Sequence, residues 1–291
     1  MSLGPVHAEL PIITMKVSGG LGNQLFQYAA ARSLSIDKRA NLLLDLSFFD
    51  RSRHRTFELD KFKTSGQFLR PKSGPRWIRT LRDMGRRALR LGSAEYFEPH
   101  YHYDPDLLKT DAPCVLNGYF QSPRYFEHHA DIIRRELQPP VATDAESHRL
   151  ARILEDPHSV SLHVRRGDYV TNAKARQMFA ECGVDYYGKA LNMVPGTGPV
   201  VVFSDDVSWA RQHLAGGRNL IFAGEESVRS GLADLWLMTK AMHHIIANST
   251  FSWWGAWLAE RQNGITIAPD RWFCESREKS ADLLPESWIR L

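Results

Sequence analysis

Two adjacent arginines mark the part of this sequence whose residue types best suit chemistry on an anion. Arg165 and Arg166 follow the alternating apolar run 160–164, and Gly167 comes directly after them. The alternation predicts a strand that ends at the arginines, where a turn begins. A guanidinium is always charged and presents a planar fork to phosphate oxygens, and a glycine lets the backbone approach a ligand closely. The alternative is an ordinary surface pair of arginines in a strand-end loop.

Polar residues gather around this pair and after two further predicted strands. His163 and Asp168 flank the arginines and could orient them or contact other parts of a ligand. The residues that follow the other two strands are Ser204, Asp205 and Asp206 in one case and Asn248, Ser249, Thr250 and Phe251 in the other. Ser249 or Thr250 at a helix N-terminus would leave backbone N–H groups free for a phosphate, or would simply cap the helix.

The two aspartates at the end of strand 200–204 have two interpretations. A carboxylate of Asp205 or Asp206 could accept the two N–H groups that guanine presents on its Watson–Crick edge. Either aspartate could instead cap the helix that follows. The sequence leaves both interpretations open.

Regular alternation of strands and helices explains why these residues should converge. From residue 159 onward we predict strands 159–164, 200–204, 219–223, 244–247 and 265–268, and helices 186–194, 207–214, 232–242 and 252–261. Such alternation predicts a parallel sheet with helices on both faces, in which ligands bind at the carboxyl ends of the strands. The polar residues named above all fall at those ends.

The first part of the chain predicts a second unit of the same α/β class. Strand 12–18, a glycine-rich turn, helix 23–35 and strand 41–46 follow one another. Gly20 and Gly22 do not have the spacing of a dinucleotide-binding loop, so they predict a tight strand-to-helix turn. Asn23 and Gln24 stand at the predicted helix start and suit the hydroxyl groups of a sugar.

Length and composition favour a two-domain protein without a membrane span. A chain of 291 residues suits two domains, and Gln138-Pro139-Pro140 ends a predicted helix 124–137, so we predict domains 1–145 and 146–291. No apolar run approaches the roughly 18 residues that a bilayer requires, and the N-terminus lacks the layout of a signal peptide. The three cysteines are widely spaced, which predicts reduced thiols. We therefore expect a cytoplasmic protein.

Residues 70–90 are strongly basic. They hold seven arginines and one lysine against the single acid Asp83, and apolar residues recur between them at helical spacing. This pattern predicts an amphipathic helix with a solvated basic face. The alternative is contact with an anionic membrane surface or an acidic glycan, which would make the protein peripheral at the inner face of the membrane.

Three long motifs resemble one enzyme family. They are His163-Val164-Arg165-Arg166-Gly167-Asp168-Tyr169, the stretch Gly19-Gly20-Leu21-Gly22-Asn23-Gln24-Leu25-Phe26-Gln27-Tyr28, and the stretch Asn248-Ser249-Thr250-Phe251-Ser252-Trp253-Trp254-Gly255-Ala256-Trp257. All three resemble motifs of the α-1,2-fucosyltransferases, glycosyltransferase family 11, in the same order. The resemblance spans residues 15 to about 270, nearly the whole chain.

The resemblance implies an α/β fold of the glycosyltransferase-B type, two Rossmann-like domains that face a cleft. Domain 146–291 would bind GDP-fucose and domain 1–145, with Gly20, Gly22, Asn23 and Gln24, would lie on the acceptor side. The implied activity is inverting transfer of L-fucose from GDP-fucose to the 2-hydroxyl of a galactose-containing glycan. Arg165 and Arg166 would neutralise the leaving diphosphate, and His163 and Asp168 would hold the arginines or the ribose. Asp168 is also a candidate for the base that takes the acceptor proton.

We expect no metal and no cofactor besides the donor substrate, because the arginines supply the positive charge. Asp104-Pro105-Asp106 has the look of the Asp-x-Asp metal motif of other sugar transferases, but a helix start capped by Asp104 explains it more simply. His128 and His129 are expected to be solvated on helix 124–137. Paired acids at Asp205 and Asp206 could also hold a metal.

Two other functions fit the same sequence. An enzyme of this fold could use another nucleotide sugar, which competition by GDP against UDP would reveal. A polyanion-binding protein could rest on the arginine-rich segment 70–90. That segment lacks the interleaved aromatic side chains that nucleic-acid binding usually shows, so we expect no nucleic-acid partner.

Overall fold

The computed structural model describes residues 10–52, 54–70, 94–167, 172–214, 218–224, 230–259, 263–274 and 281–291. The chain divides into two compact units, one of Met1–Asp60 and Thr64–Glu136 and one of Lys61–Lys63 and Leu137–Leu291. The division between Glu136 and Leu137 falls one residue before Gln138-Pro139-Pro140. Helix α5 (Ala145–Leu154) belongs wholly to the second unit. The predicted boundary after residue 145 would have placed Ala145, its first residue, in the first domain.

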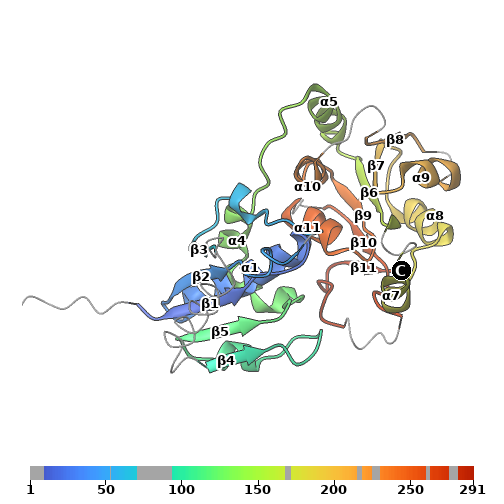
Figure 1. Cartoon of the computed structure of the whole chain (residues 1–291). Coiled ribbons are helices and arrows are strands. Elements are labelled where there is room, and N and C mark those ends of the chain that lie inside the picture. The colour runs from blue at the N-terminus through green and yellow to red at the C-terminus, as the bar shows by residue number, and fades with distance from the viewer. Residues whose placement is uncertain are drawn as a thin grey trace, which may run out of the picture. The chain divides into compact units, whose positions relative to one another are not determined.

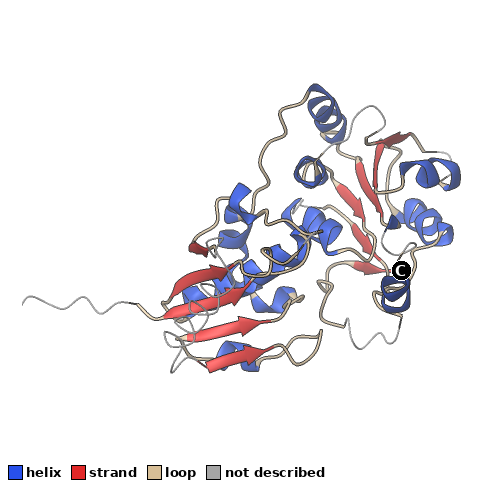
Figure 2. Cartoon of the chain, viewed as in Figure 1, coloured by secondary structure: helices blue, strands red, loops and turns tan. Residues whose placement is uncertain are grey.

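The first unit is built on a parallel sheet. In the described residues its strand order is β3 (Gln67–Leu69), β2 (Asn41–Asp45), β1 (Ile12–Lys16), β5 (Cys114–Asn117) and β4 (Ala94–Phe97). The central strand β1 pairs with β2 and β5, with Ile13 opposite both Leu42 and Cys114. Figure 2 shows the strand arrows of this sheet pointing the same way. The strands β3 and β4 lie at the two edges and were not predicted.

Helix α1 (Leu21–Asp37) connects β1 to β2 and packs against both. Its buried residues include Leu25, Phe26, Tyr28 and Leu34, which cover the apolar face of the sheet. The short elements of this unit are η1 (Leu59–Lys61), which crosses into the second unit, α3 (Asp106–Lys109), η2 (Pro123–Tyr125), η3 (Glu127–His129) and α4 (Ala130–Glu136). Three of them replace the single helix 124–137 that the sequence predicted.

The second unit has the strand order of a Rossmann fold. Its parallel sheet runs β11 (Ile289–Arg290), β10 (Thr266–Ala268), β9 (His243–Ile245), β6 (Val160–Val164), β7 (Val200–Ser204) and β8 (Leu220–Phe222). Counted from β6, this is the order 3-2-1-4-5-6 of doubly wound dinucleotide-binding sheets. The order reverses between β6 and β9, so the expected ligand crevice lies at the carboxyl ends of these two strands.

Helices cover both faces of this sheet (Figure 1). Residues of α8 (Val184–Met193) and α9 (Val207–His213) pack with Val200 and Val202 on one face. Residues of α5 and α10 (Gly231–Met238) pack with Val201 and Phe203 on the other, the face on which α11 (Thr250–Ala259) also lies. Successive side chains of β7 point to opposite faces of the sheet, and apolar residues are needed on both faces because helices cover both. A further helix, α7 (Ala173–Met178), was not predicted.

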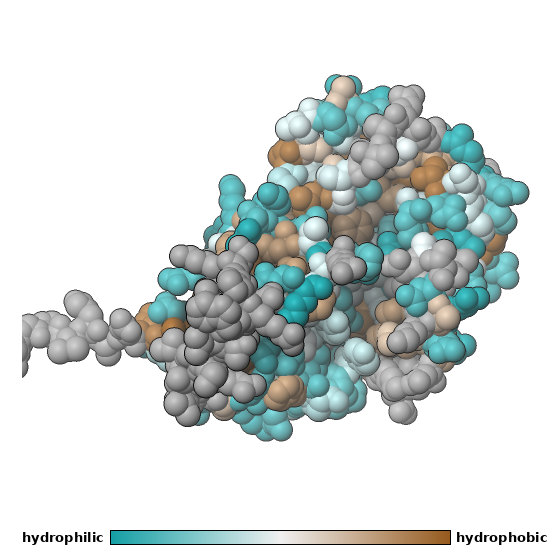
Figure 3. All heavy atoms as spheres, viewed as in Figure 1, coloured by the Kyte–Doolittle hydropathy of each residue, from teal (hydrophilic) through white to brown (hydrophobic). Residues whose placement is uncertain are grey.

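The prediction of an α/β protein with two Rossmann-like units is confirmed by these two parallel sheets. On the face seen in Figure 3, the described surface is mostly hydrophilic, with apolar side chains in small groups. Among the described residues, no helix is both long and apolar enough to cross a membrane. The basic segment 71–90 and Asp168 lie outside the described residues.

Candidate active site

The loop after β6 holds the two arginines and is fixed by Asp205 at the end of the neighbouring strand β7. The Arg166 backbone N–H donates to Asp205 Oδ1 at 2.8 Å, and Arg165 Nη1 lies 3.0 Å from Asp205 Oδ2. A Cβ at position 167 would stand 2.6 Å from Asp205 Oδ2, so a side chain there would force this carboxylate to shift. One acid therefore holds the whole arginine loop at the carboxyl edge of the sheet.

The Arg166 side chain is held on three sides. Its guanidinium carbon lies 4.0 Å from the centre of the Trp209 ring, and its Nη1 donates to Glu181 at 3.0 Å. Its Nε lies 3.7 Å from Asp206 Oδ2, too far for a hydrogen bond, and has no hydrogen-bond partner among the described residues. The side chain is only 17% exposed. The guanidinium is thus fixed in orientation by the indole and the two carboxylates.

Asp206 caps helix α9, as one of the two interpretations of the sequence required. Its Oδ1 accepts the Trp209 N–H at 3.0 Å, and the Ser204 hydroxyl accepts the N–H of Asp206 at 2.9 Å. Both oxygens of Asp205 and one oxygen of Asp206 are therefore engaged within the protein. These contacts account for the aspartates without a nucleobase, and their role in reading guanine stays a prediction.

His163 is a neutral histidine in the described structure. Its side chain is buried at the end of β6, with its ring centre 5.8 Å from that of Phe251 on α11. Burial, and then the nearby Arg165 charge, lower the pKa of His163 to about 3. Its Nδ1 is buried and has no hydrogen-bond partner among the described residues. An uncharged imidazole can bind a hydroxyl or another polar ligand group, but it adds no charge to a phosphate site.

The segment after β9 brings the start of α11 beside the arginine loop, because β9 pairs with β6. Asn248 is buried and donates through Nδ2 to the carbonyl oxygens of Ala180 and Trp272. Its amide thus anchors two loops. Ser249 accepts the N–H of Trp253 on its backbone carbonyl at 3.0 Å, so the helix begins here and its first-turn N–H groups point toward the crevice end. The tryptophans of α11 are buried core residues, as predicted.

The predicted sugar-contacting residues of the first unit stand at the start of α1. The Gly20 carbonyl accepts the N–H groups of Asn23 and Gln24, each at 3.0 Å, which closes the turn after β1. Gln24 is fully buried, and its amide donates to the carbonyls of Gly19 and Thr56 and accepts the N–H of Glu58. A contact of the Gln24 side chain with a glycan would therefore require one of these bonds to open.

Asn23 and the glycines are placed differently from Gln24. Asn23 Oδ1 accepts from Gln121 Nε2 at 3.0 Å, which joins the start of α1 to the segment after β5. Gly19 has a φ of +80°, so the tight turn predicted from the sequence is present, and Gly22 is buried in α1. The turn lies at the carboxyl ends of β1 and β5, which is the ligand-binding edge of a parallel sheet.

Sequence reasoning missed one carboxylate at this edge. Glu98 follows β4 and accepts the N–H groups of Tyr119 and Phe120 at 2.6 and 2.8 Å. Burial raises the pKa of Glu98 to about 7, although the two N–H groups lower it. The sequence offered no signal for β4, because its residues are exposed or half-buried and follow a basic segment with no strand pattern. Glu181 and Trp209 were missed because only the fold brings them to Arg166.

A short helix begins beside Asp104, as the sequence predicted, although its N-cap residue is Pro105. Asp104 Oδ1 accepts the N–H of Asp106 at 3.0 Å where α3 begins, and Asp106 pairs with Lys109. The helix-start interpretation is therefore confirmed.

A cavity of about 460 Å³ lies beside Glu181, the partner of Arg166. It opens where β10 ends, at the same edge of the sheet as the arginine loop. Its lining residues are Ala180, Glu181, Cys182, Tyr186, Pro269, Asp270, Arg271, Cys274 and Leu291.

Comparison with known proteins finds relatives that match almost the whole chain. Alpha-1,2-colitosyltransferase of Escherichia coli is 33% identical over 97% of this chain and 99% of the relative, and the O-antigen biosynthesis glycosyltransferase WbnK of Escherichia coli is 33% identical over 94% and 99%. Galactoside alpha-(1,2)-fucosyltransferase 1 of Plecturocebus brunneus is 29% identical over 95% of this chain and 74% of the relative. Among solved structures, fucosyltransferase NodZ from Bradyrhizobium aligns at a TM-score of 0.49, with 14% identity over 86% of this chain and 93% of that one.

The sequence profile of glycosyl transferase family 11 matches residues 10–291, which include all three motifs. Two relatives of similar length share a third of their residues with this chain over almost its full extent. The chain therefore belongs to glycosyl transferase family 11, and it is a glycosyltransferase.

Proposed function

We propose that this glycosyltransferase moves L-fucose from GDP-fucose to the 2-hydroxyl of a galactoside, with inversion at the sugar carbon. The observation that carries the proposal is the fixed Arg166 guanidinium at the carboxyl end of β6, beside the start of α11 and at the point where the strand order reverses. A diphosphate placed there would meet a planar cation and the positive end of a helix. The α-1,2 linkage is supported by the names of the relatives.

In the proposed reaction, catalysis comes mainly from positive charges that the fold holds in position before the donor binds. As the sugar leaves with oxocarbenium-like character, negative charge grows on the diphosphate oxygen that held it. Arg166 and Arg165 would stabilise that charge, and Asp205 keeps both arginines in place without a movement during the reaction. A base or a water relay would take the acceptor proton, and Asp168 remains the sequence candidate for it. Residues 1–145 would bind the acceptor and residues 146–291 the donor.

Arg166 provides the direct test. Replacing it with alanine should lower kcat with GDP-fucose by roughly 10²-fold or more, the usual scale for one transition-state donor. Arg166→Lys should restore little of this loss, because an ammonium cannot replace a planar fork on an indole ring. Arg176, an exposed arginine on α7, supplies the matched control through Arg176→Ala. A folded Arg166→Ala enzyme with near-normal kcat would contradict the proposal.

A colitosyl donor is the second candidate, because a relative 33% identical over 97% of this chain is an alpha-1,2-colitosyltransferase. Colitose is fucose without its 3-hydroxyl, so the two donors differ by one group. A site that hydrogen-bonds the 3-hydroxyl of fucose discriminates strongly against a colitosyl donor, which lacks this group. A site lined by apolar groups at that point discriminates much less between the two donors. The ratio of kcat/KM for the two donors decides between them, and competition by GDP against UDP tests the nucleotide.

A further inference from the structure

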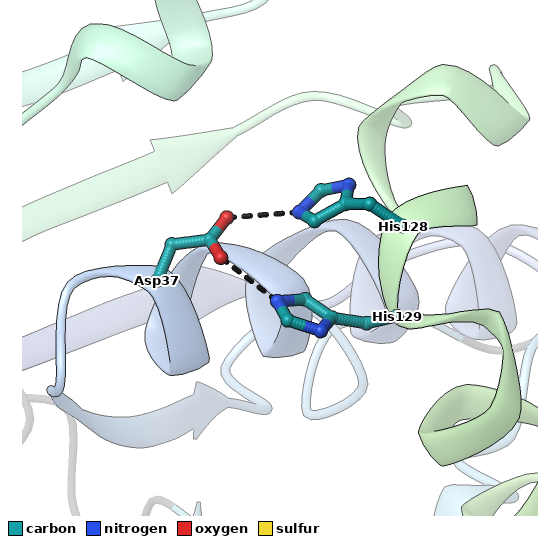
Figure 4. Close-up of side chains that lie close together, drawn as sticks. All are labelled: Asp37, His128 and His129. Atoms are coloured by element: carbon teal, nitrogen blue, oxygen red, sulfur yellow. Dashed lines mark hydrogen bonds and ion pairs between the residues drawn. The ribbon is translucent and has the colours of Figure 1, made fainter.

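Asp37, His128 and His129 form a compact cluster that the proposed transfer reaction does not use (Figure 4). Asp37 is the last residue of α1, and the histidines end η3, which packs near that helix. His128 Nε2 lies 3.0 Å from Asp37 Oδ2, and His129 Nε2 lies 2.8 Å from Asp37 Oδ1. The sequence predicted solvated histidines on a long helix, whereas the fold directs both rings to one carboxylate.

The geometry points to a binding site for a divalent transition-metal ion, and we propose Zn²⁺ as its occupant. Two imidazoles and a carboxylate are a donor set that zinc uses in proteins. In the part of the chain that the structure describes, Asp37, His128 and His129 are the one group of three metal-ligating side chains whose ligand atoms all lie within 4.8 Å of one another.

The separations come close to those around an ion bound by both carboxylate oxygens. Zinc bonds to nitrogen and oxygen are about 2.0 to 2.2 Å long, so ligand atoms 2.8 and 3.0 Å apart subtend about 90° at the ion. Each imidazole stands beside its own oxygen of Asp37, which is the arrangement that a bidentate carboxylate allows. The ring centres of the histidines are 4.4 Å apart, so rotation of the side chains can close the remaining distance.

Each histidine can hydrogen-bond to Asp37, but His128 has a second contact that the same proton must serve. His128 Nε2 also lies 3.1 Å from the hydroxyl oxygen of Ser33, which is buried one turn before Asp37. A neutral His128 ring carries at most one proton on Nε2, so Asp37 and Ser33 can only share that proton in a bifurcated hydrogen bond. If the proton is on Nδ1 instead, the lone pair of Nε2 faces the carboxylate. A metal ion on Nε2 removes this conflict, since both the lone pair and the carboxylate would then face a positive charge.

The position at the end of a helix also favours a cation. The carboxyl end of a helix carries a partial negative charge, and Asp37 adds a full one. The last turn of α1 has no basic residue, and the adjacent Lys38 is directed to Asp111, with its ammonium 3.3 Å from that carboxylate. A bound Zn²⁺ would offset both charges and join α1 to η3. The side chains of Asp37 and His128 are 36% and 40% exposed, so an ion can reach them.

Calorimetric titration of the chelator-treated, desalted full chain with Zn²⁺ alone at pH 7.5 tests the site. We expect one ion per chain, and at least a tenfold weaker Zn²⁺ affinity for Asp37→Asn and for His129→Gln. Loss of a residue that only hydrogen-bonds to a metal ligand already lowers metal affinity about ten- to a hundredfold. His100→Gln is the matched control, because exposed His100 stacks on half-buried His102, with ring centres 3.4 Å apart. Cys274→Ser controls for binding to the partly exposed thiol.

A second measurement needs no substitution at the site. Zinc should shift the Nε2 resonances of His128 and His129 in long-range ¹H–¹⁵N spectra of the unaltered protein, and it should raise the melting temperature. Absence of Zn²⁺ binding, equal affinity of the unaltered chain and His129→Gln, or shifts confined to His100 and His102 would each overturn the proposal. The readouts are independent of glycosyl transfer, so they do not depend on the proposed function.

Discussion

The guanidinium of Arg166 stacks on the indole of Trp209, with 4.0 Å between its central carbon and the ring centre. Trp209 lies in the first turn of α9, whose N-terminus is capped by Asp206, and the stretch that supplies this cap follows β7 directly. The orientation of the proposed catalytic cation is therefore set by a neighbouring strand and its helix. Four predictions test this and related features.

Trp209→Leu should lower kcat by about fivefold and leave the fold intact. A cation–π contact of this kind contributes about 1 kcal/mol, and its loss lets the guanidinium leave the plane in which it meets the diphosphate. Steady-state kinetics with GDP-fucose measures the effect, and Trp209→Phe should recover part of it. Arg211→Ala removes a similar contact in the same helix, at 5.1 Å from the Phe222 ring centre, and should leave kcat unchanged. Equal losses in the two variants would argue against a positioning role for Trp209.

Asp205→Asn should weaken binding of GDP and of IDP by the same factor. Inosine lacks the 2-amino group of guanine, so a carboxylate that reads guanine affects GDP more than IDP, whereas one that holds the arginine loop affects both alike. The contacts of Asp205 with Arg165 and Arg166 favour the second outcome. Calorimetry with both nucleotides gives the ratio. A selective loss for GDP in Asp205→Asn or Asp206→Asn would support guanine recognition instead.

Glu98→Gln should flatten the decline of stability with rising pH. The pKa of Glu98 is raised from 4.5 to about 7 in the folded protein, so between these values the unfolded chain has lost the proton that the folded chain keeps. Stability contributed by this group is therefore complete below about pH 4.5 and is lost as the pH rises to about 7. Melting temperatures from pH 4.5 to 7.5 measure it. Glu95→Gln, an exposed neighbour paired with Lys16, is the control, and an identical pH profile in the two variants would contradict the assignment.

Transfer activity should survive excess EDTA. Arg165, Arg166 and the first turn of α11 can supply the positive charge that a divalent ion supplies in other sugar transferases. Initial rates with and without EDTA, followed by addition of Mn²⁺, provide the measurement. Loss of activity that Mn²⁺ restores would return Asp104 and Asp106 to consideration as metal ligands.

Strong local patterns predicted the central elements of the second unit. Strand β7 begins at Val200 and ends at Ser204 as the apolar run indicated, and β6 begins within one residue of its predicted start. Both strands are buried on both faces; β7 is nearly continuously apolar, whereas apolar residues alternate with Ser161 and His163 along β6. The edge strand β4 has exposed residues such as Ala94 and Glu95, so its sequence shows no such apolar pattern.

Residue types predicted which polar side chains stand at the strand and helix ends, but not what each side chain contacts there. Asn248 and Gln24 are polar residues at the right strand and helix ends, yet their amides bind backbone groups of distant loops. Those partners are chosen by tertiary packing, which single-sequence patterns do not contain. For the same reason, the sequence did not predict that His128 and His129 lie beside Asp37.

The close approach of Asp205 to Gly167 restricts the order in which this site can change by mutation. A Cβ at position 167 would lie 2.6 Å from Oδ2 of Asp205, and a shift of that carboxylate would disturb its contacts with Arg165 and the Arg166 backbone. Substitution of Gly167 first should be harmful in every case. A shorter residue at position 205 must come first, at a cost to the arginine loop, before alanine or serine at position 167 becomes tolerable. The two positions are thus epistatic, and a library that varies them together should recover combinations that no stepwise path reaches without loss.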